Sequence, residues 1–509
     1  MARLKEYNGH YCESEYEYAF IGFLEAEGWK YSSGNNIRRV TKRDVLIVDD
    51  FKKFIADTNP DLTEDEVTQV YDNVRLVGAE SDFATLHKVY GWMVNGVQFT
   101  PQDGLPRMIP LIEFDNWDKN IFRVVNQFTV EYTNNGQKEN RRPDVLLFVN
   151  GMPLCVIELK NPADANATIY DAWEQINIRY WRDIPHLLHY CPLACISDGV
   201  KTRLGTVRTP YEHFYAWRRV NEGDVVSTLP FAETETMIKG VYTPERFVEI
   251  FRDYIYFQDS IYDSDEVEIV CRYPQFFAAK LLKQSIVNSV VTRSGKGGTY
   301  FGATGCGKTY TMAFLARQLA LRCTNIPEIG SPTIILIVDR DELQKQGSKL
   351  FTKSKEFLNL GEVSVVKNRT QLRQELGARQ SGGFYICTIQ KFCDREDDKI
   401  GLINDRQNII CFSDEAHRTQ LEHSKKIQFS KDADENMKAM VSKPYAKVLK
   451  EAFPHATFVG FTGTPIAETY QPLVMKLTDI QWIRQLQMDL LFPLSIIRVL
   501  QRYCLIIKK

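Results

Sequence analysis

The chain has 509 residues, too many for a single hydrophobic core, so its length predicts about two to four domains. Its composition, 44% hydrophobic and 25% charged, is that of an ordinary soluble globular protein. The formal net charge of −2 excludes a global basic field, although a nucleic-acid partner would need only a local basic track.

Cysteine usage and hydropathy indicate the compartment. The eleven cysteines lack the spacing of a metal or disulfide framework, since no second pair accompanies Cys191 and Cys195. This predicts free thiols in a reducing cytosol. The N-terminus has no apolar core of signal-peptide length, and the longest apolar runs, such as 334–338, fall far short of the roughly 20 residues of a membrane span. We therefore expect a cytoplasmic protein with no membrane segment.

The first segment, residues 1–220, mixes helical and strand-like patterns. A helical pattern over 16–27 ends at Gly28, a helix-stop signal. Strand-like runs follow at 122–132, 145–149 and 154–159, and a further helical stretch covers 167–181.

Two acidic motifs lie next to the last two of these strand-like runs. Pro143-Asp144 and Glu158-Leu159-Lys160 match the pattern P-D…(D/E)-x-K, with the two acids 14 positions apart. Acidic oxygens can hold Mg²⁺ beside a phosphodiester, and a lysine can orient water or neutralise charge. The pattern therefore indicates a nuclease site; the alternative is an exposed strand end with ordinary charges.

The geometry of this site depends on a hairpin. Asn150-Gly151 is a turn signal between two apolar runs. A plain two-residue loop would pair Asp144 with Ile157 and leave the two acids on opposite faces of the sheet. A three-residue loop or a bulge would pair Asp144 with Glu158, and directly opposed residues share a face. We predict this second register, with Lys160 on the same face because it lies two residues after Glu158.

Residues 221–270 have a mixed pattern and are interpreted as a connector. From 271 onward apolar, β-branched runs at 333–338, 384–389, 409–412 and 457–461 alternate with helical stretches. This order predicts an α/β, RecA-like lobe built on a doubly wound parallel sheet over 271–467.

Residues 302–309 match the phosphate-binding pattern G-x-x-x-x-G-K-[ST] in full. Glycines let backbone N–H groups approach phosphates, the lysine offers positive charge, and the last hydroxyl can bind Mg²⁺. The helical stretch that follows would direct its N-terminal dipole at the anion. The residues expected to bind ATP here are Gly302, Thr304, Gly305, Cys306, Gly307, Lys308 and Thr309.

A second ATP-site motif, Asp414-Glu415-Ala416-His417, ends the apolar run that begins at Ile409. Asp414 can hold Mg²⁺ through its water shell, and Glu415 can polarise the attacking water. A third apolar run ends in Thr462-Gly463-Thr464-Pro465, which taken alone is an ordinary turn.

In this order, the motifs resemble those of the R subunit of type I restriction–modification enzymes. The resemblance rests on Pro143-Asp144, on 156–162 (VIELKNP), on 196–199 (ISDG) and on motor motifs similar to those of superfamily 2, and it runs from near residue 10 to about residue 467. It implies an N-terminal PD-(D/E)xK endonuclease domain over 1–220 and an ATP-driven motor. Duplex DNA would be the substrate, cut away from the recognition site, with methyltransferase (M) and specificity (S) subunits as partners.

The resemblance also implies roles for single residues. Asp144 and Glu158 would hold metal, Lys160 would serve cleavage, and Glu17 sits where the family has a first-helix acid. Gln275 resembles the adenine-reading glutamine of the motors. The family also has a glutamine and a tyrosine that normally lie four residues apart. Here Gln175 and Tyr180 are five residues apart, and they remain candidates for this motif.

Residues 468–509 do not continue the family pattern and read as a truncated or frame-shifted second lobe. Since the second lobe supplies an arginine to the γ-phosphate, we expect ATP binding with impaired hydrolysis, translocation and cleavage. The alternatives are a catalytically silent remnant that binds ATP or the methyltransferase core, and a stand-alone nuclease–helicase. The N-terminal position of the nuclease motifs argues against a type III-like subunit.

Overall fold

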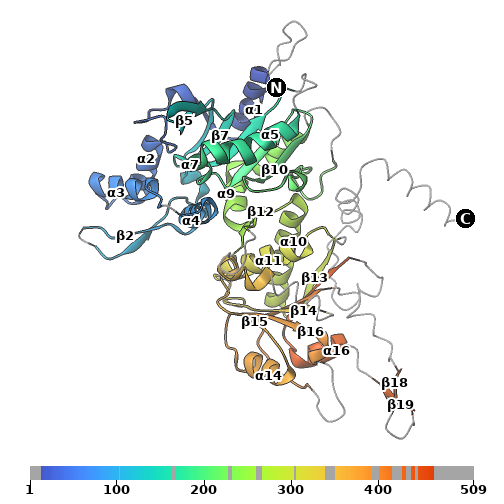
Figure 1. Ribbon diagram of the computed structural model, residues 1–509. Helices are drawn as coiled ribbons and strands as arrows, with labels where there is room; N and C mark the ends of the chain where they lie inside the picture. Colours follow the sequence, from blue (N-terminus) through green and yellow to red (C-terminus); the bar gives the residue numbers. More distant parts are fainter. Residues whose placement is uncertain are drawn as a thin grey trace, which may run out of the picture. The chain divides into compact units, whose positions relative to one another are not determined.

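The computed structural model (Figure 1) describes residues 13–78, 80–102, 104–161, 168–226, 232–258, 266–302, 305–338, 350–392, 400–414, 427–431, 437–441 and 445–463. The chain divides into two compact units. The first comprises Met1–Phe257 and Asp265–Tyr273, and the second comprises Gln258–Ser264 and Pro274–Lys509. Most of the segment interpreted as a connector therefore packs with the first unit.

A six-stranded mixed sheet forms the centre of the first unit, in the order β1-β4-β7-β8-β9-β10. β1 runs parallel to β4 and β8 parallel to β9, while the other neighbours are antiparallel. β7 and β8 are buried at every position because apolar side chains cover both of their faces. The strands are β1 (Lys30–Ser33), β4 (Phe122–Asn126), β7 (Val145–Val149), β8 (Met152–Leu159), β9 (Leu193–Ser197) and β10 (Thr202–Thr206).

Helices pack on this sheet. α1 (Glu13–Ala26) contacts β1, β4 and β8, and α5 (Ile169–Glu174) contacts β8 and β9. α1 ends just before Gly28, whose φ of 105° is the left-handed conformation that the helix-stop signal predicts. The remaining elements beside the sheet are η3 (Gln175–Tyr180), α6 (Trp181–Asp183), α7 (Pro185–Leu188), α8 (Ala232–Val241), α9 (Pro244–Asp253), β11 (Ile255–Phe257) and β12 (Glu268–Val270).

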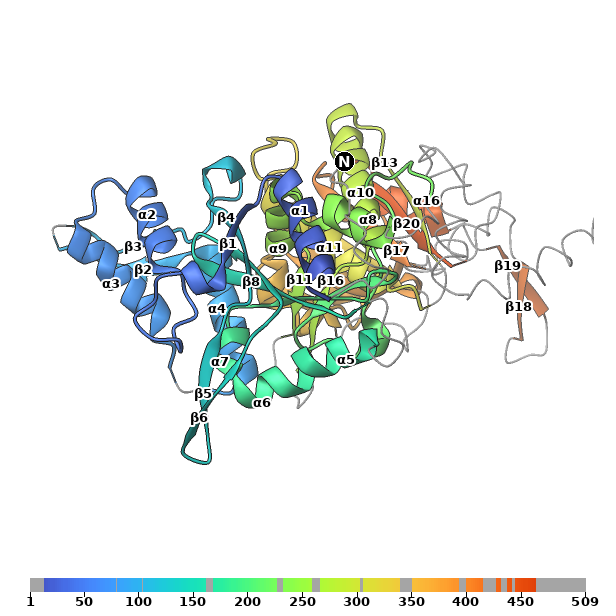
Figure 2. The same ribbon diagram turned by 90° about the horizontal axis from the view of Figure 1, so that it is seen from above.

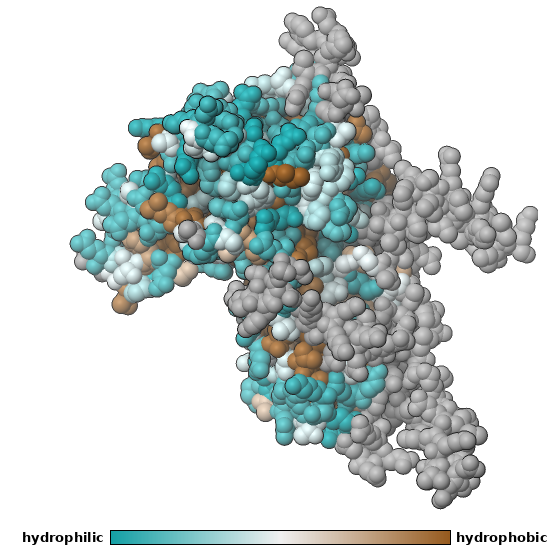
Figure 3. Space-filling model, in the orientation of Figure 1, coloured by the Kyte–Doolittle hydropathy of each residue, from teal (hydrophilic) through white to brown (hydrophobic). Residues whose placement is uncertain are grey.

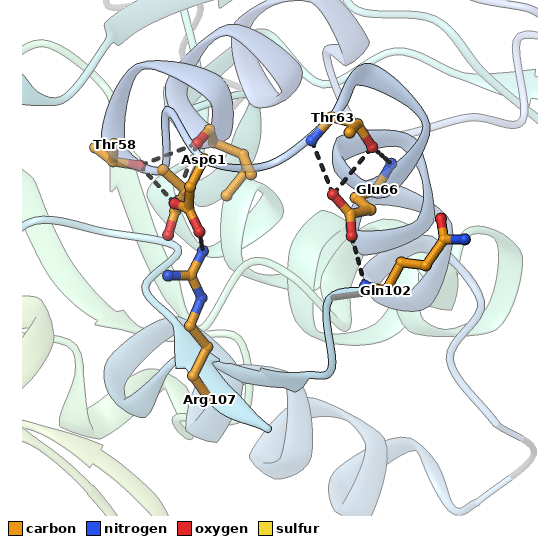
Figure 4. A network of polar contacts seen from close by, with 8 residues as sticks. Thr58, Asp61, Thr63, Glu66, Gln102 and Arg107 are labelled. Carbon is orange, nitrogen blue, oxygen red and sulfur yellow. Dashed lines mark hydrogen bonds and ion pairs between the residues drawn. The ribbon is translucent and has the colours of Figure 1, made fainter. Parts of the chain in front are cut away.

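A helical part of the first unit contains α2 (Val48–Thr58), α3 (Glu64–Arg75), α4 (Asp82–Asn95) and the hairpin β2 (Val97–Phe99) and β3 (Arg107–Ile109). Polar contacts fix the start of α3 (Figure 4). Thr63 and Glu66 form a capping box, and the Glu66 carboxylate also accepts the backbone N–H of Gln102 at 2.8 Å. Arg107 bonds to Asp61 at 2.6 Å. The loop before β3 is thereby held against the first turn of α3.

The hairpin between β7 and β8 has the register that we predicted. Val149 pairs with Met152 across the two-residue turn, but Leu147 pairs with Cys155, so a bulge adds one residue to β8. Val145 consequently faces Ile157, which places Asp144 opposite Glu158. The prediction of a bulge or a longer loop is confirmed.

The second unit is built on a six-stranded sheet in the order β13-β20-β17-β14-β16-β15, parallel throughout. Its strands are β13 (Lys296–Phe301), β14 (Thr333–Val338), β15 (Val363–Val365), β16 (Phe384–Thr388), β17 (Ile409–Asp414) and β20 (Thr457–Thr462). Its helices include α10 (Tyr273–Thr292), α11 (Lys308–Arg322), α13 (Lys355–Leu358), α14 (Arg369–Ala378), η5 (Ile389–Phe392) and α16 (Tyr445–Ala452). A short antiparallel pair, β18 (Ile427–Lys431) and β19 (Met437–Val441), completes it. The parallel sheet expected from the alternating pattern is confirmed.

The described residues also show the state of the cysteines. Eight cysteines within them are buried free thiols: Cys155, Cys191, Cys195, Cys271, Cys306, Cys323, Cys387 and Cys411. Within the same ranges, no helix combines the length and the apolar character needed to cross a bilayer.

Candidate active sites

The two acidic motifs of the first unit meet at one edge of its sheet. Glu158, near the end of β8, has no exposed surface, whereas Asp144, just before β7, is partly exposed. The Asp144 carboxylate accepts the backbone N–H of Leu159 at 2.8 Å, which ties it to the β8 strand. Asp144 and Glu158 also interact side chain to side chain. Both carboxylates therefore lie on the same side of the sheet.

A glutamine and a tyrosine of the following helix bind Glu158. The Tyr180 hydroxyl donates to Glu158 Oε1 at 2.5 Å, and the Gln175 amide donates to Oε2 at 2.7 Å. In an α-helix, residues on one face lie three or four apart, so a spacing of five would separate these side chains. Residues 175–180 instead form the π-helix η3, whose wider turn brings residues five apart onto one face. The backbone thus accommodates the shifted spacing.

Lys160 joins the same cluster. Its Nζ donates to Gln175 Oε1 at 3.0 Å, so Gln175 bridges the lysine and the Glu158 carboxylate. Its backbone N–H donates to the carbonyl of Ser197 on β9 at 2.8 Å, which fixes the chain just after β8. Glu158 and Lys160 thus share one side of the strand, as their spacing predicts.

Glu17 lies on α1, beside this cluster but bound to other residues. Asn126 and Gln127 donate side-chain amides to its two oxygens at 2.6 and 2.7 Å. The Gln127 backbone N–H in turn donates to the Asp144 carbonyl. Across the described ranges, no three or more His, Cys, Asp or Glu side chains are grouped to hold a metal ion, so Glu17 does not form such a set with Asp144 and Glu158. Its role as a ligand stays a prediction.

The electrostatics of the pair favour a bound cation. Burial raises the pKa of Glu158 well above its usual value, and the nearby negative charge of Asp144 raises it further. The positive charge of Lys160 and the hydrogen bond from Tyr180 act in the opposite direction. Burial, with Glu158 as the second cause, raises the pKa of Tyr180, so its hydroxyl stays protonated as a donor. Two adjacent carboxylates of this kind fit a hard divalent cation, because it would stabilise both charges.

The phosphate-binding motif of the second unit lies between β13 and the N-terminus of α11. Gly305 and Gly307 have φ values of 83° and 84°, and a Cβ at Gly307 would come within 2.5 Å of the Gln275 side chain. Glycine is therefore required at Gly307 for both reasons. The Lys308 Nζ lies 3.3 Å from the Gly302 carbonyl, to which it donates a hydrogen bond, so its charge sits within the loop. Cys306 is buried against Tyr300, and Thr309, in the first turn of α11, is half-buried.

The strand order brings the remaining ATP-site motifs to the same edge of the sheet. Asp414 ends β17, and Thr462 ends β20, which lies between β13 and β17. The Thr462 carbonyl accepts the backbone N–H of Gly302 at 3.0 Å. Since neighbouring strands are about 4.8 Å apart, Asp414 lies about two strand spacings from the phosphate loop. Thr304 and Glu415, and the residues that follow Gly463, fall outside the described ranges.

Gln275, expected to read adenine, also touches the phosphate loop. It lies near the start of α10, is only 4% exposed, and its amide donates to the Gly307 carbonyl at 3.2 Å. It therefore lies beside the nucleotide motif, and its contact with a base stays a prediction. Among the residues that the motifs did not reveal, Asn126 and Gln127 hold Glu17, and only their position at the end of an apolar strand could have drawn attention to them.

Two parts of the chain match known protein families. Residues 11–213 match the N-terminal domain of the type I restriction enzyme R protein, and residues 274–479 match the SWI2/SNF2 ATPase. The chain is thus similar to a restriction-enzyme N-terminal domain in its first part and to an ATPase domain in its second. It is, as the motifs indicated, a relative of the endonuclease subunits of type I restriction enzymes.

Individual relatives agree with this assignment. The type I restriction enzyme HindI endonuclease subunit of Haemophilus influenzae is 30% identical over 89% of this chain and 43% of its own length. A type I restriction enzyme endonuclease subunit of Staphylococcus aureus is 25% identical over 70% of this chain and 33% of its own length. The chain therefore spans less than half the length of these relatives.

One solved structure shares a smaller part of the chain. The Sulfolobus solfataricus SWI2/SNF2 ATPase core in complex with dsDNA is 13% identical over 45% of this chain and 36% of that chain, with a TM-score of 0.26. No argument rests on so slight a likeness.

Proposed function

We propose that this chain is the motor–nuclease (R) subunit of a type I restriction–modification system. In this proposal the first unit holds the PD-(D/E)xK endonuclease domain (1–220), and the lobe over 271–467 binds ATP as one lobe of a motor that moves duplex DNA. Cleavage falls away from the recognition site, which M and S subunits in the cytoplasm would supply. The observation that carries the proposal is the cluster in which Asp144 and Glu158 lie on one side of the sheet with Lys160 attached through Gln175.

The residues of the cluster have separable roles. Asp144 and Glu158 would hold Mg²⁺, which when bound supplies Lewis acidity at the phosphodiester and lowers the pKa of a bound water. Lys160 presents a positive charge beside the phosphate and orients the attacking water. Gln175 and Tyr180 position the Glu158 carboxylate, because each donates to one of its oxygens and leaves further lone pairs for a ligand.

In the second unit, Lys308 and Thr309 would bind the phosphates and Mg²⁺ of ATP, and Asp414 would hold the metal through water. Glu415 would act on the attacking water, and Gln275 would lie beside the base. The support for this arrangement is the strand order, which gathers these motifs at one end of a parallel sheet, where ligands bind in such folds.

The direct test is nicking of supercoiled DNA by the full chain with Mg²⁺. Asp144→Asn and Glu158→Gln should each reduce nicking at least about 100-fold, because each removes a charge that metal binding requires. Asp57→Asn, an exposed acid on α2, is the matched control and should leave nicking unchanged. Equal activity of the Asp144 variant and the control would refute the nuclease assignment.

The motor has its own test. Lys308→Ala should abolish binding of a fluorescent ATP analogue, since the phosphates lose the positive charge of the loop. The same variant should retain the metal-dependent nicking measured without ATP, because Lys308 lies in the second unit. Retained nucleotide binding by Lys308→Ala would refute the ATP-site assignment.

A further inference from the structure

A basic, exposed loop lies beside the carboxylate cluster of the first unit. Residues 34–44 begin over the end of β4, where a Cβ at Gly34 would meet the backbone of residues 126–128 at 2.7 to 2.8 Å. This is the stretch that holds Glu17 and bonds to the Asp144 carbonyl. The loop therefore starts at the edge of the cluster. Its exposed side chains include Arg38, Lys42 and Arg43.

The loop is held in a defined conformation. Asp44 accepts the backbone N–H of Thr41 at 2.8 Å, which closes a turn, and Arg39 stacks on the Phe128 ring at 3.8 Å. Arg39 is thus an anchor, whereas Arg38, Lys42 and Arg43 point outward with no ion pair to another described residue.

A β-hairpin continues this basic surface. It consists of β5 (Val130–Asn134) and β6 (Gln137–Arg141), and the backbone N–H of Glu131 donates to the Lys42 carbonyl at 3.0 Å. Figure 2 shows the hairpin projecting from the rest of the first unit, and Figure 3 shows a mostly hydrophilic surface where β5 lies in Figure 1. The loop and the hairpin are therefore adjacent.

The charges of the hairpin also favour an anion. Lys138 and Arg142 are exposed, whereas Glu139 accepts hydrogen bonds from Tyr132 and Asn134. At its base, Arg141 pairs with Asp183 at 2.6 Å. Glu139 is thus held by neutral donors of the hairpin itself. Over residues 130–142 the basic side chains Lys138, Arg141 and Arg142 outnumber the acidic Glu131 and Glu139. The tip, residues 134–137, is Asn-Asn-Gly-Gln, polar and uncharged.

We propose that the loop 34–44 and the hairpin β5–β6 form the surface by which the first unit binds duplex DNA. The loop would contact phosphates through Arg38, Lys42 and Arg43, and the hairpin tip would enter a groove, since the major groove admits a two-stranded β-ribbon. β6 ends three residues before Asp144, a span of at most about 10 Å, or roughly three nucleotides along the helix axis. A duplex held there would present a phosphodiester to Asp144 and Glu158. The inference rests on the proposed nuclease function.

Site-specific crosslinking tests this surface in the full chain. A photoreactive p-benzoylphenylalanine replaces Asn135 at the hairpin tip, or Lys53 on α2 as the control position. After irradiation with a fluorescent duplex, crosslinks should form from position 135 and be at least tenfold weaker from position 53. Equal crosslinking from both positions would overturn the inference.

A second experiment removes the positive charges of the loop. In the position-135 protein, the triple variant Arg38→Ala, Lys42→Ala, Arg43→Ala should reduce crosslinking roughly tenfold or more, and the loss should shrink as salt is raised, because three phosphate contacts are missing. The matched control removes three other positive charges of the first unit, at Lys53, Lys88 and Lys119. A loss as large in the control would contradict a specific surface.

The readout also separates the two proposals. Crosslinking from position 135 should persist in an Asp144→Asn background, because binding does not require cleavage. Crosslinking without any nicking by the unmodified chain would support the surface and refute the nuclease assignment. Nicking without crosslinking from position 135 would overturn the surface alone.

Discussion

The Tyr180 hydroxyl provides the sharpest test at the scale of single residues. It donates to Glu158 and so favours the ionised carboxylate, against burial and the charge of Asp144, which raise the pKa of Glu158. Tyr180→Phe should therefore raise that pKa further. Because the ionised form is needed to hold metal, cleavage near neutral pH should fall about 10- to 100-fold, and the acidic limb of the pH–rate profile should move to higher pH.

The control for this effect is Tyr190→Phe. Tyr190 is also a buried tyrosine, but its hydroxyl donates to the Val74 carbonyl at 2.7 Å, away from the cluster. Its removal should lower stability and leave the pH–rate profile in place. A Tyr180→Phe variant with lower activity but an unmoved profile would show that the hydroxyl does not act through Glu158.

Residue types and spacing were enough to predict that Asp144, Glu158 and Lys160 lie together, since nuclease chemistry would need these groups near a strand end. The interactions of Gln175 and Tyr180 could not be derived in the same way, because five residues of separation places them on one face only in a π-helix. The sequence carries no signal for the hydrogen bonds that hold Glu17, because its partners Asn126 and Gln127 are 109 and 110 residues away.

At the scale of elements, the two Asn-Gly hairpin turns allow a matched comparison. Asn150 and Asn135 have φ values of 51° and 48°, so replacement by alanine strains both turns equally. Asn150 is fully buried and bonds to Ile121, Leu111 and Asn120, whereas Asn135 is exposed. Asn150→Ala should lower the free energy of unfolding by about 3 kcal/mol, and Asn135→Ala by about 1 kcal/mol.

Denaturant unfolding of the full chain, followed by the near-ultraviolet signal of the first unit, measures this difference. Similar losses in the two variants would mean that the buried hydrogen bonds of Asn150 are replaced in the variant, contrary to the expectation.

The turn itself was evident from the sequence, but the bulge that sets the register was inferred only from the requirement that the two acids share a face. Pro153 favours a bulge, because proline cannot donate to the ladder of a central strand, but the sequence does not identify Leu154 as the extra residue.

The first turn of α3 makes a pH-dependent contribution. The backbone N–H groups of Gln102 and Thr63 lower the pKa of Glu66 from its usual 4.5. The ionised Glu66 carboxylate therefore stabilises the folded chain fully at pH values above its pKa in the unfolded chain. This contribution is lost as the pH falls through the lower pKa of Glu66 in the folded chain. Glu66→Gln should lower the melting temperature at pH 7, and the gap to the unmodified chain should close under acidic conditions. A gap that is the same at every pH would contradict this role of the charge.

At the scale of the whole molecule, the strand order of the second unit was not derivable from the motifs. Alternating strands and helices predict a parallel sheet, but they do not say that β20 lies between β13 and β17. The position of β20 is set by packing among buried apolar strands. These strands have similar compositions, so their composition does not tell which two are neighbours. The division into two units was expected from length, yet its position at 273 and 274 depends on which elements the residues after 220 pack against.

Because the two candidate sites lie in different units, each ligand should protect only its own unit from hydrogen exchange. ATP with Mg²⁺ should slow exchange in β13, α11 and the end of β17, and leave β7 and β8 unchanged. At a ligand concentration 100-fold above Kd, linkage stabilises the bound state by about 2.7 kcal/mol, enough to be resolved in segments that open with their unit. Lys308→Ala should abolish this protection, whereas Glu158→Gln should retain it, since Glu158 belongs to the first unit. Protection of β7 and β8 by ATP in the Lys308→Ala variant would show that nucleotide binds the first unit, contrary to the assignment of the phosphate loop.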